Sequence, residues 1–351
     1  MPRLIVAALA FACGSAFAQA PPATSAPSAA YFDHTGRVPE DVLSGGVRMI
    51  PVHTSFGDFR VWTKRVGNNP RIKVLLLHGG PGATHEYLEA FDSWFPGAGI
   101  EYYYYDQLGS AYSDQPDDKR LLDLPRYVDE VEQVRAALGL DKDDFYLYGH
   151  SWGGILAIEY ALRYPQHLKG LVVSNMMSSI PAYNRYAQSV LMPAMDPQQL
   201  AGIRKLEAEG RFDDPHYEEL LTPFYEQHLL RKPAAQWPDP INRAFGHLNK
   251  KVYVPMQGPS ELGAGGLLAN WDRTADLPKI RVPTLVIGAR YDTMDPAWME
   301  KMSRLLPHGQ YLYCPDAGHF AMYDDPAIYM KGVIDFLERT DRDARAASAA
   351  R

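Results

Sequence analysis

The chain has 351 residues, which fits either two domains of about 150 residues or one large α/β domain that carries an insertion. Hydrophobic residues make up 46% and charged residues 22% of the chain, a composition that excludes disordered, collagen-like and coiled-coil proteins. The net charge of −7 comes from 35 basic and 42 acidic residues, so a nucleic-acid partner is not expected.

Residues 1–18 have the pattern of a secretory signal peptide. Arg3 supplies a positive start, the apolar run Leu4–Ala12 is too short to cross a bilayer, and Ala-Phe-Ala ends at Ala18. No other stretch reaches the roughly 18 apolar residues of a membrane-spanning helix. The sequence therefore predicts cleavage near Ala18, a periplasmic or secreted protein and no membrane span.

The chain contains two cysteines. Lipidation of Cys13 is the disfavoured alternative to signal cleavage, because the bulky Phe11 precedes it by two residues. Removing residues 1–18 leaves Cys314 alone, so no intramolecular disulfide is expected.

Short β-rich runs begin near Val47, and the third of them includes Val74–Leu77, which is apolar without alternation. Such a run is typical of a strand that is covered on both faces in a parallel sheet. A helix is predicted at 124–138, between the N-cap candidate Asp123 and Gly139 just past its end. The elements expected in the first half are strands at 47–52, 59–66, 72–77, 100–105, 145–148 and 168–174 and helices at 124–138 and 152–164.

Strands and helices alternate up to Asn175 and again from Val282, at the spacing of parallel crossovers. This predicts an α/β protein with a doubly wound, mostly parallel sheet. The segment 175–276 is amphipathic and rich in Tyr, Phe, Trp, Pro and Met, and we interpret it as an inserted helical cap. In the second half we expect strands at 282–288 and 311–314 and helices at 296–306 and 326–337. The predicted organisation is a signal peptide (1–18), a flexible leader (19–44), a first core segment (45–174), the cap (175–276), a second core segment (277–338) and a frayed tail (339–351).

The clearest chemical motif is Gly149-His150-Ser151-Trp152-Gly153, a G-x-S-x-G between a predicted strand and a predicted helix. At such an elbow the serine is held on a tight turn, with its hydroxyl raised at the helix N-terminus. Ser151 is therefore predicted to be a nucleophile, which requires a base and a group that orients the base.

At an elbow of this kind the acid and then the histidine follow the serine in chain order. Asp292 and His319 satisfy that order, and each follows a predicted strand at the edge of the sheet where ligands bind. Asp295 is interpreted as the N-cap of the helix that begins at Pro296, and Asp316 as a turn residue.

Acyl transfer also requires backbone donors for the developing oxyanion, each worth about 3–4 kcal/mol. The N–H of Trp152, next to the nucleophile, is predicted to be one donor. The other is predicted in the loop His78-Gly79-Gly80-Pro81-Gly82, with Gly80 as our choice.

Four motifs occur together: HGGPG at 78–82, DQLGS at 106–110, GHSWGG at 149–154 and DAGH at 316–319. In this combination the chain resembles, from about residue 45 to 338, the proline iminopeptidase family of serine aminopeptidases in the α/β-hydrolase superfamily. It is most similar to the branch that includes the tricorn-interacting aminopeptidase. The family usually has Gly-x-Gly after Asp-Gln, whereas this chain has Gly109-Ser110-Ala111, which implies a small adjustment of that loop.

The resemblance implies an α/β-hydrolase fold and the release of an N-terminal residue, often proline, from short peptides that have a free N-terminus. A cationic α-amino group needs a carboxylate in the cap. Glu261 stands in a segment similar to the family's amine-binding motif, and Glu219 is a guess for a second acid beside Glu218.

The sequence thus predicts an exported serine exopeptidase with no metal or organic cofactor. The alternatives are an esterase, lactonase or amidase with the same Ser151, Asp292 and His319, or a binding protein that retains the fold without catalysis. First-residue specificity and oligomeric state stay open at this level.

Overall fold

The computed structural model describes residues 45–350. The predicted signal peptide, Cys13 and the leader 19–44 lie outside these residues. None of the helices in the described range is long and apolar enough to cross a lipid bilayer.

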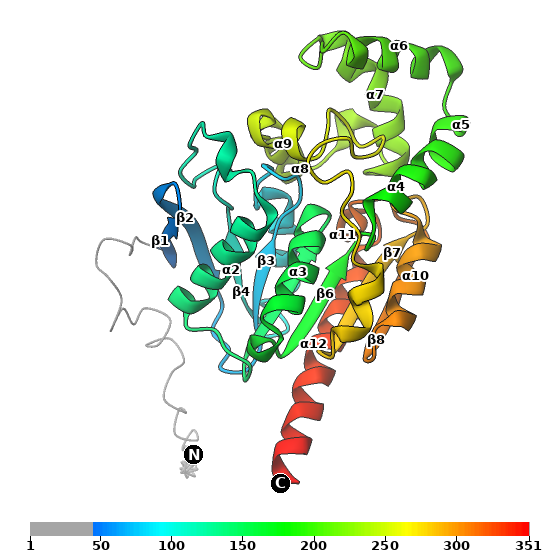
Figure 1. Ribbon diagram of the computed structural model, residues 1–351. Helices are drawn as coiled ribbons and strands as arrows, with labels where there is room; N and C mark the ends of the chain where they lie inside the picture. Colours follow the sequence, from blue (N-terminus) through cyan, green and yellow to red (C-terminus); the bar gives the residue numbers. More distant parts are fainter. Residues whose placement is uncertain (1–44, 351) are drawn as a thin grey trace, which may run out of the picture.

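An eight-stranded sheet forms the centre of the molecule, in the order β1-β2-β4-β3-β5-β6-β7-β8 (Figure 1). β1, β2 and β4 pair antiparallel, and every later pair is parallel. The predicted doubly wound, mostly parallel sheet is confirmed. The strands are β1 (Val47–Thr54), β2 (Gly57–Val66), β3 (Lys73–Leu77), β4 (Glu101–Tyr105), β5 (Phe145–His150), β6 (Gly170–Ser174), β7 (Thr284–Ala289) and β8 (Gly309–Cys314).

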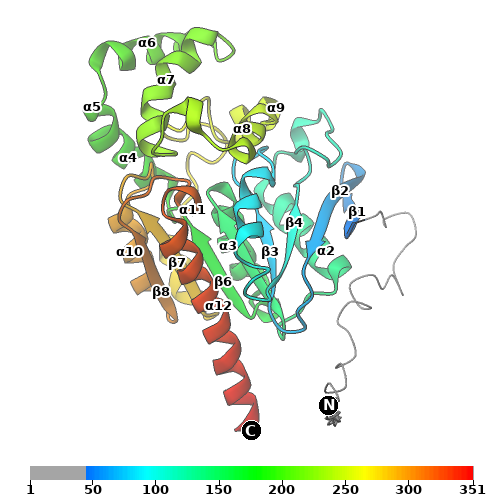
Figure 2. The same ribbon diagram turned by 180° about the vertical axis from the view of Figure 1, so that it is seen from behind.

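Alternate side chains of β3 enter two separate cores. Leu75 and Leu77 pack on one face of the sheet, Val74 and Leu76 on the other, because successive residues of a strand point in opposite directions. The first face is covered by α2 (Leu124–Leu138), α3 (Trp152–Arg163) and α10 (Pro296–Leu305), and the second by η2 (Glu86–Ser93), α11 (Ala321–Asp324) and α12 (Pro326–Ala349) (Figures 1 and 2). Two short 3-10 helices, η3 (Lys119–Leu121) and η4 (Pro165–His167), lie in connections.

The chain between β6 and β7 forms a helical layer over the carboxyl ends of the strands, at the top of Figure 1. The end of α7 contacts the loop that carries His319, because the N–H of His319 donates to the His228 carbonyl at 2.8 Å. This layer therefore closes over the edge of the sheet where the predicted site lies. Its helices are α4 (Ile180–Tyr186), the π-helix η5 (Ala187–Leu191), α5 (Met192–Ala194), α6 (Pro197–Ala208), α7 (Pro215–His228), η6 (Ala234–Gln236), α8 (Asp239–Gly246), α9 (Lys250–Met256) and η7 (Thr274–Lys279).

The last helix differs from the sequence prediction. The sequence predicts a helix that ends at Leu337 and a frayed tail over 339–351, whereas α12 continues to Ala349. The cause is Asp341, which is buried and pairs with Lys169 at 2.8 Å and with Arg71 at 3.3 Å. The tail prediction is therefore wrong as far as Ala349, because a buried ion pair fixes the helix to the sheet and its Ala-rich end favours helix.

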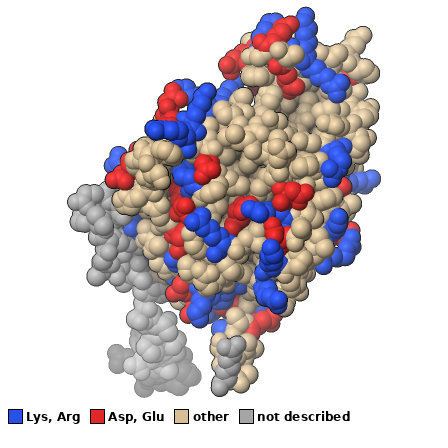
Figure 3. All heavy atoms as spheres, viewed as in Figure 1, with Lys and Arg blue, Asp and Glu red and all other residues tan. Residues whose placement is uncertain are grey.

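Charged side chains of both signs are interspersed on the face seen in Figure 3. A nucleic-acid-binding face would instead gather Lys and Arg into one basic patch. The face seen in Figure 3 does not show such a patch.

Candidate active site

The turn between β5 and α3 holds Ser151 in a strained conformation, with a φ of 55°. A Cβ at Gly149 would lie 2.0 Å from the Gly153 carbonyl oxygen, and one at Gly153 would lie 2.3 Å from that of Leu77. Only glycine fits at either position, which is why the motif has this spacing. The N–H of Ser151 donates to the Ser174 carbonyl at 3.0 Å, which anchors the elbow to β6. Strain of this kind is often stored at functional sites.

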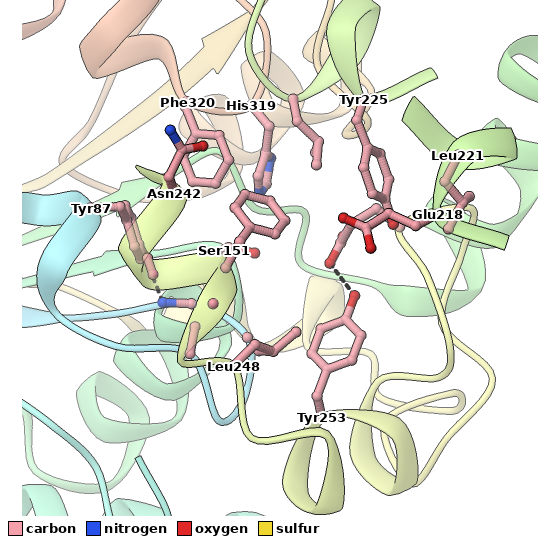
Figure 4. Close-up of a pocket in the computed structure, with 18 of the residues that line it drawn as sticks. Tyr87, Ser151, Glu218, Leu221, Tyr225, Asn242, Leu248, Tyr253, His319 and Phe320 are labelled. Carbon is pink, nitrogen blue, oxygen red and sulfur yellow. Dashed lines mark hydrogen bonds between the residues drawn. The ribbon is translucent and has the colours of Figure 1, made fainter. Parts of the chain in front are cut away.

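His319 and Asp292 form a buried pair behind the elbow. Nδ1 of His319 lies 2.7 Å from Oδ1 of Asp292, and both side chains are almost fully buried. A proton on Nδ1 leaves Nε2 free to accept a hydrogen bond. Ser151 and His319 line the same cavity, as Figure 4 shows. The structure therefore brings the predicted nucleophile, base and acid together at one end of the sheet.

The pKa of His319 is raised above its ordinary value. Burial alone would lower it, but the charge of Asp292, the hydrogen bond to Asp292 and the charge of Glu261 together outweigh burial. An imidazole in this setting holds a transferred proton well. The arrangement therefore suits a general base that must stabilise its own cationic form.

His150 stands beside the serine but is unsuited to the role of base. Burial, and then the nearby His319, lower its pKa well below the ordinary value. Its Nε2 lies 2.9 Å from the His319 carbonyl and its Nδ1 lies 3.1 Å from the Tyr87 hydroxyl. His150 is therefore a neutral group that supports the loop of His319.

The loop after β3 places glycine backbone next to the serine. Gly79 and Gly80 both line the cavity. The N–H of Gly79 is already used, because it donates to the Tyr87 hydroxyl at 2.6 Å. Gly80 has a φ of 108°, and a Cβ there would lie 2.5 Å from the N atom of Ala83. Since the Gly79 N–H is occupied, Gly80 remains the candidate oxyanion donor of this loop.

Trp152 is the first residue of α3, where backbone N–H groups have no acceptor within the helix. Its indole N–H donates to Oε1 of Gln107 at 2.8 Å, and Nε2 of Gln107 donates to the His78 carbonyl at 3.1 Å. Gln107 therefore joins the elbow to the glycine loop, so both predicted oxyanion donors belong to one hydrogen-bonded unit.

Glu261 lines the same cavity as Ser151 and His319. Its Oε1 accepts a hydrogen bond from the Tyr253 hydroxyl at 2.5 Å, and its backbone carbonyl accepts one from the Tyr183 hydroxyl at 2.7 Å. Burial raises the pKa of the Glu261 carboxyl. Among the ion pairs between described residues, none involves Glu261, so this carboxylate is available to a cation from outside.

Glu219 is wrongly predicted to be the second acid that binds the substrate amine. Glu219 does not line the cavity; its side chain is 74% exposed and lies 3.1 Å from His216. Glu218 lines the cavity instead, because neighbours on a helix point about 100° apart. The periodicity of α7 carries the signal, since the cavity residues Leu221 and Tyr225 follow Glu218 at i+3 and i+7.

Asp295 caps α10 as predicted, because its side chain accepts from the Ala297 N–H at 2.9 Å. Sequence reasoning missed Asn175, whose side-chain amide lies 2.7 Å from Asp292. In residues 45–350, no group of three or more His, Cys, Asp and Glu side chains is arranged to hold a metal ion.

The comparisons with known proteins agree with this geometry. A family model described as alpha/beta hydrolase fold matches residues 73–326. A proline iminopeptidase from Flavobacterium johnsoniae is 57% identical over 290 residues, 82% of this chain and 97% of the relative, and one from Elizabethkingia meningoseptica is 55% identical over 296 residues, 84% and 98%.

Among solved structures, a proline iminopeptidase from Mycobacterium smegmatis has a TM-score of 0.75 and 27% identity, covering 85% of this chain and 99% of its own. The sequence comparison and the structure comparison thus both find proline iminopeptidases. The chain belongs to the alpha/beta hydrolase fold family and, within it, to the proline iminopeptidases.

Proposed function

We propose that this protein is an exported serine aminopeptidase that releases an N-terminal residue, chiefly proline, from short peptides through an acyl-enzyme. Ser151 attacks the carbonyl carbon of the first residue while His319 takes the hydroxyl proton. Asp292 fixes the imidazole orientation and stabilises the imidazolium, and the N–H groups of Gly80 and Trp152 bind the oxyanion. His319 then gives the proton to the leaving amine, and a water molecule hydrolyses the ester by the reverse sequence.

The observation that carries the proposal is that a carboxylate without an ion-pair partner among the described residues shares the cavity with the nucleophile. Glu261 and Glu218 both line this cavity of about 590 Å³. A free α-amino group has a pKa of about 7.7–8 and is mostly cationic at neutral pH. Two carboxylates in the same cavity as Ser151 therefore favour substrates that carry a free amine close to the scissile bond.

The cavity also suits a proline side chain. The rings of Tyr87, Phe245 and Phe320 line it, with the Tyr87 and Phe320 ring centres 5.3 Å apart. A cavity with both an apolar wall and carboxylates matches a pyrrolidine ring whose nitrogen is charged. The curated relatives named proline iminopeptidase support the same substrate.

The deciding experiment compares a Pro-X dipeptide with its N-acetylated form. We expect cleavage of the free-amine substrate and at least a roughly 100-fold lower kcat/KM for the acetylated one, because acetylation removes the charge that the carboxylates bind. Comparable rates, together with rapid cleavage of simple esters, would favour the esterase, lactonase or amidase alternative.

The Glu261→Gln variant is expected to lower kcat/KM for Pro-X peptides by about 100-fold, because a neutral amide cannot pair with the substrate ammonium. Hydrolysis of a small activated ester without an amine should change by less than about threefold. The measurement is steady-state kinetics on both substrates.

Glu219→Gln is the matched control, since it makes the same chemical change outside the cavity and should leave both substrates unaffected. Equal losses on the peptide and the ester in Glu261→Gln would mean that Glu261 does not bind the amine.

Export is proposed from residues 1–18 alone. Full-length protein expressed in a Gram-negative host should be found in the periplasmic fraction or the medium, with a mature N-terminus near Gln19 by Edman sequencing. Intact Met1 on cytoplasmic protein would remove this part of the proposal.

A further inference from the structure

Asn175 is the first residue after β6, at the carboxyl edge of the sheet between the nucleophile and the acid. It is fully buried and has a φ of 51°, an uncommon conformation for a residue other than glycine. Its N–H donates to the Ile287 carbonyl on β7 at 2.9 Å, and the preceding carbonyl, of Ser174, accepts the Ser151 N–H. The backbone at Ser174 and Asn175 is thus tied to both neighbouring strands.

The two carboxylate oxygens of Asp292 have separate partners. Oδ1 accepts from His319 at 2.7 Å and from the Met294 N–H at 3.0 Å. Oδ2 accepts from Nδ2 of Asn175 at 2.7 Å. Asp292 is fully buried, so protein donors must take the place of water around its oxygens. Asn175 supplies one of these donors on the side away from the histidine.

A chain of hydroxyl groups fixes the direction of the Asn175 amide. The Ser174 hydroxyl donates to Oδ1 of Asn175 at 2.7 Å, so Nδ2 must face Asp292. The single hydroxyl proton of Ser174 is then used, which makes the Tyr329 hydroxyl, 2.7 Å away, the donor to Ser174. By the same reasoning the Tyr148 hydroxyl, 2.5 Å from that of Tyr329, donates to Tyr329.

We infer that Asn175 is a positioning residue that holds the Asp292 carboxylate aimed at His319, and that the chain Tyr148, Tyr329, Ser174 keeps its amide from flipping. Every donor in the chain points toward Asp292, and the hydrogen bonds polarise one another in the same sense. This inference rests on the catalytic roles proposed above, but not on the identity of the substrate.

The test is Asn175→Ala, measured on both a Pro-X peptide and an activated ester. We expect kcat to fall about 10- to 100-fold on each substrate with KM within about twofold, because the substitution removes one hydrogen bond to a buried charge and leaves the cavity wall intact. Loss on both substrates separates this role from amine binding, so the result can be judged even if the peptide is not the substrate.

The pH profile distinguishes positioning from simple stabilisation. His319 must be neutral to accept the serine proton, so kcat/KM falls below the pKa of His319. Removing the Asn175 amide dipole leaves the carboxylate charge less compensated, so the pKa of His319 should rise and the acidic limb should move to higher pH. The titratable groups that face the pair from neighbouring elements are His150, His228, Glu261, Tyr183, Tyr186, Tyr311 and Cys314, and the substitution alters none of them.

Two further variants complete the experiment. Ser174→Ala keeps Asn175 but removes the hydroxyl that orients its amide. It should move the acidic limb to higher pH, as Asn175→Ala does, with a smaller loss of kcat. If Asn175→Ala does not fold, Ser174→Ala tests the inference by itself. Tyr146→Phe removes a buried hydrogen bond of 3.2 Å to the Leu337 carbonyl and should lower only the Tm. The inference would be overturned if Asn175→Ala and Ser174→Ala kept the wild-type acidic limb and the wild-type kcat and showed only a lower Tm, as Tyr146→Phe does.

Discussion

Ser151→Ala is expected to lower kcat by on the order of 10⁶, since serine, histidine and aspartate act as one unit and the hydroxyl is the atom that forms the covalent bond. The structure gives no substitute nucleophile within the elbow, because the neighbouring motif positions are His150, Trp152 and glycines. Measurement requires an active-site titration of the wild type and a purified variant free of trace wild-type enzyme.

Binding should survive this substitution. Glu261 and the apolar wall of the cavity are unchanged, so Ser151→Ala should still bind a Pro-X dipeptide, and calorimetry would give its Kd. Thermal unfolding provides the control for the fold, since alanine must adopt the strained φ of 55° that Ser151 has. Turnover within about tenfold of the wild type would mean that Ser151 is not the nucleophile and would reopen the binding-protein alternative.

Much of the core could be predicted from the sequence because local and global signals agree there. The helix at 124–138 has its predicted bounds, since the Asp123 side chain accepts from the Arg126 N–H and Gly139 adopts a left-handed φ of 67°. The candidates Ser151, Asp292 and His319 could likewise be chosen from the sequence, because the G-x-S-x-G motif marks the serine and the other two follow predicted strands in the expected chain order.

The features that escaped prediction depend on contacts distant in sequence. Asn175 contacts Asp292 at a separation of 117 residues in the sequence, and Asp341 contacts Lys169 at a separation of 172. No local sequence pattern predicts either contact. Glu218 and Glu219 have the same chemistry, and only the orientation of α7 over the cavity separates them. The cap is therefore the part of the cavity wall that sequence reasoning predicted least well.

Asp292→Asn is the second substitution with a large expected effect, about 10⁴ in kcat, because it removes the negative charge that stabilises the imidazolium of His319. The surroundings make the loss severe. Oδ1 faces the donors His319 and Met294, and Oδ2 faces the donor Asn175, whereas an amide has one acceptor oxygen. Whichever way the introduced amide turns, its NH₂ group faces another donor, so the imidazole loses its fixed tautomer or the Asn175 chain is disrupted.

The pH dependence of the residual activity of Asp292→Asn tests the direction in which the pKa of His319 shifts. The charge and hydrogen bond of Asp292 raise the pKa of His319 against the effect of burial, so Asp292→Asn must lower it. The neutral imidazole then persists to more acidic pH, and the acidic limb of kcat/KM should move down, opposite to the shift expected for Asn175→Ala. A limb that moves the same way in both variants would show that the pH dependence reports a group other than the pair His319 and Asp292, and the assignment of the base would have to change.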